Sequence, residues 1–102
     1  MSTVNVKLDN FNEIVNGEKT VLLDFYADWC GPCRMVAPVL HEIAEEHPEY
    51  VIGKINVDNE PELARQFNVM SIPMLVVMKG GKVAVSSVGA KNKAQILKML
   101  EA

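Results

Sequence analysis

Residues 20–33 read TVLLDFYADWCGPC, and this stretch decides which fold the chain adopts. Its first half, residues 20–26, is a nearly continuous apolar run, which is typical of a strand buried on both faces of an α/β sheet. From Cys33 onward the apolar residues recur at helical spacing as far as His47. The stretch therefore predicts a buried strand that leads into a long helix, with Cys30 and Cys33 at the junction.

The rest of the chain predicts further strands and helices around this unit. Apolar or alternating runs predict strands at residues 3–7, 50–57, 74–78 and 83–88, and helical spacing predicts helices at 11–15, 59–67 and 91–102. The Gly80-Gly81 turn joins the last two strands into an antiparallel hairpin. Helices between the first four strands imply parallel crossovers. The pattern predicts an α/β fold with a mixed sheet, formed by a single domain of residues 1–102.

Composition and charge limit the class of protein. The chain has 102 residues, of which 49% are hydrophobic and 23% charged, as expected for one globular core. Ten basic and thirteen acidic residues give a net charge of -3, which is the wrong sign for a nucleic-acid or anionic-membrane binder. The N-terminus carries no apolar targeting segment, and no apolar run approaches the roughly 20 residues of a membrane span. We therefore expect a cytoplasmic protein.

Cys30 and Cys33 are the only two cysteines in the chain. A disulfide across so short a loop removes little entropy from the unfolded chain, so redox chemistry explains the pair better than stability does. The free N–H groups and the positive dipole end at the start of a helix favour a thiolate, and we expect a lowered pKa for Cys30. Cys30 is then the nucleophile that attacks a partner disulfide, and Cys33 resolves the mixed disulfide. Two electrons move without a bound cofactor.

A zinc site is the alternative explanation of a Cys-x-x-Cys motif, and it needs two further ligands. The only histidines, His41 and His47, lie on the same predicted helix as Cys33. At a rise of 1.5 Å per residue, His47 lies roughly 20 Å along the helix axis from Cys33, so the four side chains cannot converge. The pattern favours a redox dithiol and no metal.

The segment from Asp24 to Cys33 closely resembles the active-site segment of the thioredoxin family. The resemblance continues through KINVD at residues 54–58, SIP at 71–73 and VGA at 88–90, and covers essentially the whole chain. It implies the thioredoxin fold, with a five-stranded mixed β-sheet flanked by four helices. It also implies a protein-disulfide reductase with a redox-active disulfide. Such a protein carries electrons from thioredoxin reductase, which draws on NADPH, to disulfide-containing target proteins.

The resemblance also assigns roles to single residues near the disulfide. In the family the first cysteine, here Cys30, is exposed and the second, here Cys33, is buried. Asp24 interrupts an apolar strand, so burial should raise its pKa and suit it to accept the Cys33 proton, which is its role in the family. The alternative is a carboxylate that simply reaches solvent at the sheet edge. Lys54 lies beside Asp24 by resemblance and would tune that pKa; the alternative is a side chain that extends into solvent.

A docking surface for the target is implied around the cysteines. Pro73 corresponds to the family's cis-proline, and the backbone of Ile72 pairs with an extended target segment; a proline that merely precedes a strand is the plainer explanation. We expect this surface to comprise Trp29, Gly31, Pro32, Ile72, Pro73, Val88 and Gly89.

Three residues depart from the family's usual pattern. Tyr26 stands where bacterial members most often have Trp, Ser71 where Gly is common and Met74 where Thr is common. We expect these departures to shift partner preference. A binding subunit with the thioredoxin fold but without turnover is the second hypothesis, although binding alone needs neither the cysteine pair nor Asp24. We expect a monomer, without nucleic-acid or membrane partners.

Overall fold

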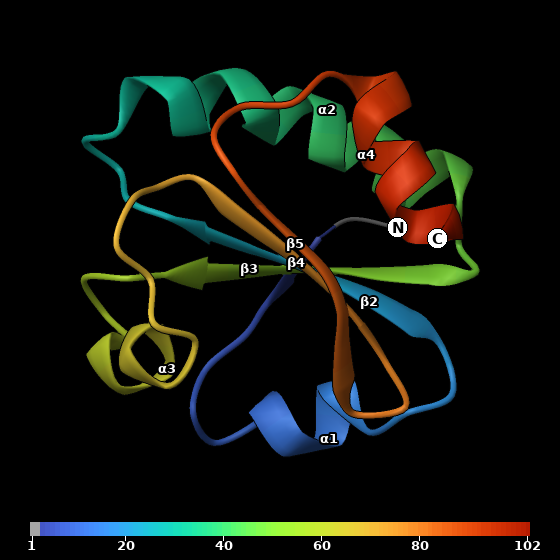
Figure 1. Cartoon of the computed structure of the whole chain (residues 1–102), viewed down its shortest axis with the longest axis horizontal. Coiled ribbons are helices and arrows are strands. Elements are labelled where there is room, and N and C mark those ends of the chain that lie inside the picture. Colours follow the sequence, from blue (N-terminus) through green and yellow to red (C-terminus); the bar gives the residue numbers. More distant parts are fainter. Residues whose placement is uncertain (1–2) are drawn as a thin grey trace.

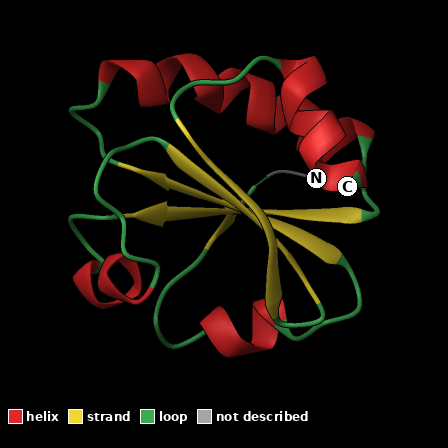
Figure 2. Cartoon of the chain, in the orientation of Figure 1, coloured by secondary structure: helices red, strands yellow, loops and turns green. Residues whose placement is uncertain are grey.

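The computed structural model describes residues 3–102 as a central β-sheet with helices on both faces (Figure 1). The elements in chain order are β1 (Val4–Asn5), α1 (Phe11–Val15), β2 (Thr20–Tyr26), α2 (Gly31–Glu46), β3 (Tyr50–Asn56), α3 (Pro61–Gln66), β4 (Met74–Lys79), β5 (Lys82–Val88) and α4 (Lys93–Glu101). The strand order is β1-β3-β2-β4-β5. Helices α2 and α4 cover one face, and α1 and α3 cover the other (Figure 2). The predicted α/β architecture, a mixed sheet with flanking helices, is confirmed.

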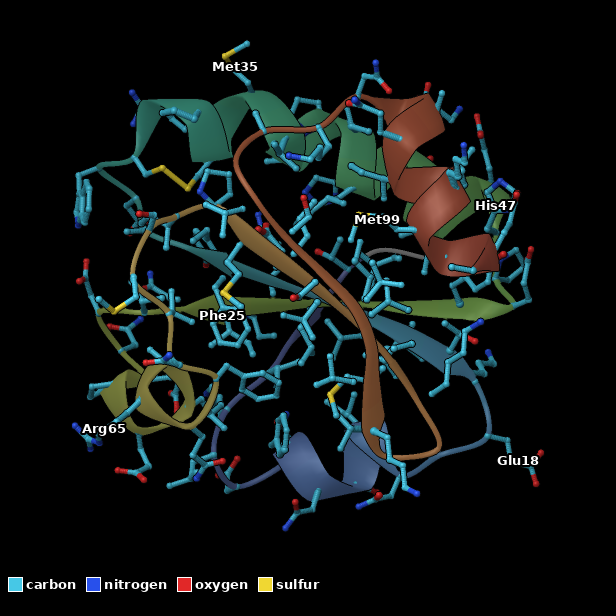
Figure 3. All side chains as sticks on the ribbon, in the orientation of Figure 1. Glu18, Phe25, Met35, His47, Arg65 and Met99 are labelled. Atoms are coloured by element: carbon cyan, nitrogen blue, oxygen red, sulfur yellow. A yellow bond between two sulfur atoms is a disulfide. The ribbon has the colours of Figure 1, made fainter. Side chains whose placement is uncertain are left out.

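Strand β2 lies at the centre of the sheet, and its side chains are buried on both faces. It pairs in parallel with β3 and antiparallel with β4. Leu22 packs in the core under α2 and α4, whereas Leu23 and Phe25 pack in the core against α1 and α3. Figure 3 shows Phe25 pointing from the sheet toward the side of α3. Burial on both faces explains why the sequence of this strand is a continuous apolar run.

The direction of β4 differs from the prediction. Parallel crossovers between the first four strands are expected from the sequence, but β4 runs antiparallel to β2. Helix α3 has 6 residues, so it rises only about 9 Å along its axis, less than half the length of a seven-residue strand such as β3. The length of α3 does not by itself decide the direction, because α1 has only 5 residues and joins the parallel strands β1 and β2. Since β4 runs antiparallel to β2, it also runs antiparallel to β3 and begins near the edge where β3 ends, and β5 returns antiparallel to β4 as the hairpin predicts.

Helix starts and the edge strand also differ from the predicted bounds. Strand β1 comprises only Val4–Asn5, where the alternation predicts residues 3–7. Helix α2 begins at Gly31, directly after its N-cap Cys30, which agrees with the expected place of Pro32 in its first turn. Helix α4 begins after Asn92, whose side chain accepts the backbone N–H of Gln95. A capping side chain satisfies an N–H that the first helical turn leaves free, and this determines where each helix starts.

Gly53 marks the place where β3 comes closest to the chain around β1. It pairs with Val4, and a Cβ at Gly53 would lie 2.6 Å from Val6 Cγ2 and 3.3 Å from Leu23 Cδ2. Val6 and Leu23 are both buried in the core, so neither can move freely. We expect Gly53→Ala to lower the free energy of unfolding by about 1–3 kcal/mol, measured by urea denaturation.

Gly17→Ala is the control for this substitution, because a Cβ there would meet only ordinary contacts, the nearest at 3.7 Å. It adds the same methyl group without crowding a core side chain. Equal free energies of unfolding for the two variants would contradict the close packing of β3 against Val6.

Candidate active site

Cys30 and Cys33 form a disulfide at the N-terminus of α2, drawn as a yellow bond in Figure 3. The Cα atoms of the two residues lie 5.3 Å apart. Cys30 is the N-cap of α2, and its Sγ accepts the backbone N–H of Cys33 at 3.2 Å. Pro32 lies in the first turn, where a missing N–H leaves no helical hydrogen bond unmade. The helix start therefore directs an N–H group and the positive end of its dipole at the Cys30 sulfur, as predicted.

Both cysteines are nearly buried in the disulfide form. Cys30 is 5% exposed and Cys33 is 3% exposed, so the expected contrast between an exposed and a buried cysteine is wrong for this state. Ala27 and the partly buried Ile72 pack around the pair and cover it from the side. Gly31 is exposed, and a Cβ built on it would meet nothing within 4 Å. The disulfide is thus shielded on its flanks and open over Gly31.

The loop before β4 lies against the disulfide. The Ile72–Pro73 peptide bond is cis, as the resemblance implies, and the carbonyl oxygen of Ile72 lies 3.9 Å from the Sγ of Cys30. Gly89 adopts a φ of 101°, which favours glycine, and donates its N–H to the carbonyl of Pro73 at 2.8 Å. This bond brings the exposed Val88 to the same end of the sheet. Four of the predicted docking residues therefore gather on the Cys30 side of the molecule.

Trp29 is 68% exposed beside the disulfide, yet its side chain is held in place. Its indole N–H donates to the Asp58 carboxylate at 2.9 Å. Trp29 also lines a cavity of about 180 Å³ whose other walls are apolar, formed by Val57, Ala64, Val69, Met70 and Ile72. Sequence reasoning assigned no role to Asp58. The available signal was an acidic residue directly after a buried strand, at the sheet edge where Cys30 lies.

Asp24 is a fully buried carboxylate in the middle of β2, with 0% exposure. Neither of its oxygens has a hydrogen-bond partner among residues 3–102. Lys54 lies opposite it on β3 and places Nζ 3.7 Å from Oδ2, an ion-pair distance that is too long for a hydrogen bond. Burial raises the pKa of Asp24 to about 6, and the charge of Lys54 opposes part of this rise.

Lys54 connects Asp24 with two cavities. Its side chain is 13% exposed, and its Nζ lies 4.3 Å from the centroid of the Tyr26 ring. One cavity of about 210 Å³ is lined by Lys54, Tyr26 and Cys33. A second cavity of about 350 Å³, on the β1 side, is also lined by Lys54 and Tyr26. The structure therefore brings Lys54 beside Asp24, as the resemblance implies, rather than out into solvent.

Residues 3–102 show neither a grouping of metal ligands nor a membrane-spanning helix. In this range no three His, Cys, Asp or Glu side chains are grouped so that they could hold a metal ion. His47, considered above as a zinc ligand, pairs with Glu49 and stacks on Tyr50 just beyond the end of α2. The same residues include no helix that is long and apolar enough to cross a membrane.

The chain is similar to known proteins in sequence and in structure. The family model described as Thioredoxin matches residues 2–102. The thioredoxin of Alicyclobacillus acidocaldarius is 47% identical over 96 residues, which cover 93% of this chain and 91% of that protein. A bifunctional thioredoxin reductase/thioredoxin of Mycobacterium leprae is 48% identical over 91 residues, covering 88% of this chain and 20% of that protein. A mutant thioredoxin from Halobacterium salinarum superposes with a TM-score of 0.92 at 32% identity, covering 98% of this chain and 88% of that one.

Asp24 makes the stability of the fold depend on pH. Its pKa is about 6 in the folded chain against an ordinary value of 3.8. Below about pH 4 the carboxyl is protonated in both states; between about pH 4 and 6 the unfolded chain loses the proton first, so the free energy of unfolding falls as pH rises. The loss amounts to about 3 kcal/mol at pH 7. Asp24→Asn should remove this dependence and raise the free energy of unfolding at pH 7 by about 1–3 kcal/mol, since burying an amide offsets part of the gain.

The measurement is urea denaturation of the oxidised protein from pH 4 to pH 8. Asp9→Asn removes an exposed carboxylate and serves as the control. The same fall in stability with pH in the wild type and in Asp24→Asn would show that Asp24 does not carry the raised pKa.

Proposed function

The chain belongs to the thioredoxin family and is a thiol–disulfide oxidoreductase, and we propose that Cys30 and Cys33 reduce target disulfides in two exchange steps. The observation that carries this proposal is the Cys30–Cys33 disulfide in the first turn of α2, with the Cys33 N–H directed at the Cys30 sulfur. In the reduced protein this N–H and the helix dipole favour the Cys30 thiolate. The thiolate attacks one sulfur of the target disulfide. The target S–S bond breaks, its other sulfur leaves as a thiolate, and a mixed disulfide joins Cys30 to the target.

Cys33 completes the reaction with the help of Asp24. The Cys33 thiol gives its proton to the Asp24 carboxylate, and the resulting thiolate attacks the Cys30 sulfur of the mixed disulfide. The bond to the target breaks, the second target sulfur leaves as a thiolate, and the Cys30–Cys33 disulfide forms. The target gains two electrons and this chain loses two. A pKa of about 6 supports this role, because Asp24 is then largely ionised near neutral pH but still basic enough to hold a proton.

The proton has a short path from Cys33 toward Asp24. Cys33 and Lys54 line the same cavity of about 210 Å³, and the Lys54 ammonium lies 3.7 Å from the Asp24 carboxylate. We infer that water in this cavity relays the proton, since polar side chains, among them Asp28 and Arg34, line part of it and it has room for water molecules. Lys54 tunes the acceptor by its charge.

The target binds in an extended conformation over the open side of the disulfide. The nearly buried sulfurs, the Ile72 carbonyl beside Cys30 and the exposed Trp29 ring support this binding mode. The docking surface in this proposal comprises Trp29, Gly31, Pro32, Ile72, Pro73, Val88 and Gly89.

Regeneration of the dithiol requires an electron donor. The family works with thioredoxin reductase, and the Mycobacterium leprae relative is named as a bifunctional thioredoxin reductase/thioredoxin. We infer that a thioredoxin reductase using NADPH also reduces this chain, which binds no cofactor itself. We further propose that residues 1–102 act as one monomeric domain in the cytoplasm, where dithiols are kept reduced, on disulfide-containing proteins and without nucleic-acid or membrane partners.

Serine substitutions separate the roles of the two cysteines. Cys30→Ser should abolish the reduction of insulin disulfides, because the attacking thiolate is lost. Cys33→Ser should accumulate a mixed disulfide with insulin, because nothing resolves it. Mass spectrometry before and after dithiothreitol detects this adduct. Full turnover by Cys30→Ser would refute Cys30 as the nucleophile, and absence of turnover in the wild type would favour a binding subunit.

Asp24→Asn tests the proton acceptor. We expect insulin reduction to slow by about 100-fold near pH 7, and the inflection of the pH–rate profile near pH 6 to disappear. Excess reductase and NADPH from pH 5.5 to 8.5 keep regeneration of the dithiol from limiting the rate. Asp9→Asn, which removes an exposed carboxylate, should behave as the wild type does. An inflection that survives in Asp24→Asn would assign the proton to another group.

A further inference from the structure

Tyr26 has no role in the mechanism above, although it lies two residues after Asp24 on the same face of β2. We propose that Tyr26 is a positioning residue, whose ring holds the Lys54 ammonium at ion-pair distance from Asp24. This inference rests on the proposed role of Asp24 as proton acceptor and adds a residue that sets the charge around it.

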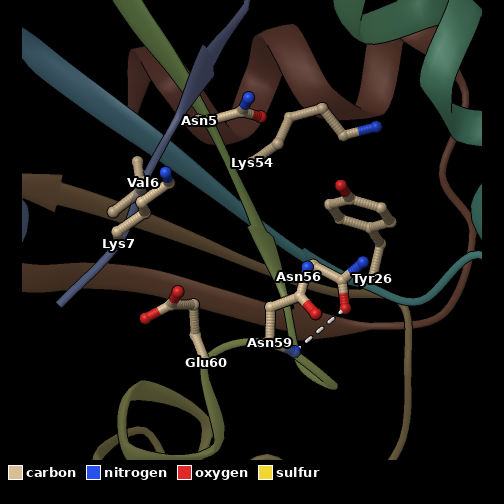
Figure 4. A pocket seen from close by; sticks show the side chains of 8 residues that line it. All are labelled: Asn5, Val6, Lys7, Tyr26, Lys54, Asn56, Asn59 and Glu60. Atoms are coloured by element: carbon tan, nitrogen blue, oxygen red, sulfur yellow. Dashed lines mark hydrogen bonds between the residues drawn. The ribbon is translucent and has the colours of Figure 1, made fainter.

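The Lys54 ammonium is held between a carboxylate and an aromatic face. Its Nζ lies 3.7 Å from Asp24 Oδ2 and 4.3 Å from the centroid of the Tyr26 ring. Figure 4 shows the Lys54 side chain, which comes from β3, beside the Tyr26 ring. A cation over an aromatic face is attracted by the ring quadrupole, and the attraction strengthens when little water competes, as for a side chain that is 13% exposed.

The Lys54 ammonium lies next to two cavities, so the ion pair with Asp24 alone does not fix its position. Tyr26 and Lys54 line both the cavity of about 210 Å³ on the Cys33 side and the cavity of about 350 Å³ on the β1 side. The two side chains therefore form the wall between the cavities. A lysine has a flexible four-carbon stem and a strongly hydrated head, so it can turn toward water on either side. The ring favours the position between the cavities, beside Asp24.

Lys54 is the charged group that matters most to Asp24 among residues 3–102, because it is the cation within ion-pair distance of the carboxylate. On the other side of β2, β4 places the apolar Leu75 opposite Asp24. The titratable or charged groups that line the two cavities are Tyr26, Asp28, Cys33 and Arg34 on the α2 side, and Lys7 and Glu60 on the β1 side.

The geometry leaves the carboxylate both stabilised and free to react. The ammonium favours the ionised form, which opposes the rise that burial causes in the pKa of Asp24. Because the separation exceeds hydrogen-bond distance, neither carboxylate oxygen accepts a hydrogen bond from any group in residues 3–102. A ring that keeps Lys54 at this separation thus helps Asp24 to be ionised before Cys33 loses its proton. It also leaves the carboxylate oxygens available to accept that proton.

The test measures how strongly Lys54 and Asp24 are coupled with and without the ring. Asp24 is titrated by carboxyl ¹³C NMR in the oxidised protein, where Cys30 and Cys33 do not titrate and cannot perturb the curve. Lys54→Met should raise the pKa of Asp24 by about one unit in the wild type. The same substitution should have nearly the same effect in Tyr26→Phe, which keeps the ring. In Tyr26→Leu its effect should fall below about half the wild-type shift, because the ammonium is no longer held near Asp24.

Tyr50→Leu is the matched control, because it is the same substitution at a tyrosine that stacks on His47 instead of on Lys54. Its Lys54–Asp24 coupling should equal that of the wild type. Tyr26→Met supplies a second ring-free variant if Tyr26→Leu does not fold. Equal coupling in the ring-free variants and the wild type would overturn the positioning role of Tyr26.

The reduction assay distinguishes failure of this inference from failure of the proposed function. In Tyr26→Leu the inflection of the pH–rate profile should move by the same amount as the pKa of Asp24. An inflection that stays in place while that pKa moves would overturn the link from Tyr26 to turnover. A pH profile of Asp24→Asn that matches the wild type would reject Asp24 as the acceptor, whereas the NMR coupling tests Tyr26 without any assumption about turnover.

Discussion

Burial of β2 on both faces is the constraint on which the rest of the structure depends. The strand lies between β3 and β4 with helices on either side, so its position and register are determined by packing. Its C-terminal end leads within four residues to the N-cap of α2. Cys30 is therefore presented where the carboxyl ends of parallel strands meet a helix start, a crevice that α/β proteins use for their chemistry. Because the strand and helix are both anchored in the core, disulfide exchange can proceed without rearrangement of the fold.

Asp24 is the charged residue in the otherwise apolar interior of β2, and its properties follow from the burial of that strand. In a buried central strand, a carboxylate is unfavourable unless charge or hydrogen bonds compensate, and among residues 3–102 the Lys54 ammonium at 3.7 Å supplies this compensation. The same burial that lowers stability at neutral pH raises the pKa of Asp24 to about 6, which suits the proton transfer proposed above. Proteins commonly accept such local destabilisation at functional sites, where a relaxed arrangement would lose activity. The charge of Lys54 opposes part of the rise in the pKa of Asp24, and in our proposal Tyr26 keeps that charge in place.

The sequence predicted the features that depend on local pattern. The run at residues 20–26 matches β2 to the residue, because burial on both faces allows only an apolar strand. The direction of β4 was missed, because it depends on the path of residues 57–73 between β3 and β4, which apolar spacing does not report. The cis Pro73 bond came from the family resemblance, since residue type alone does not report the isomer. The Tyr26–Lys54 contact was missed because it joins two strands and depends on their register.

The near-complete burial of Cys30 and Cys33 limits which target disulfides can come into contact with them. Cys30 is only 5% exposed and its flanks are covered, so an incoming sulfur meets least obstruction over Gly31. A disulfide inside a rigid part of a target protein cannot reach the Cys30 sulfur in this way, whereas a disulfide on a flexible segment can. If the chain reacts by the exchange proposed above, its targets are disulfides on segments mobile enough to reach the recessed sulfurs. A requirement for mobility concerns the segment around the target disulfide and not its side chains, so it does not depend on a particular target sequence.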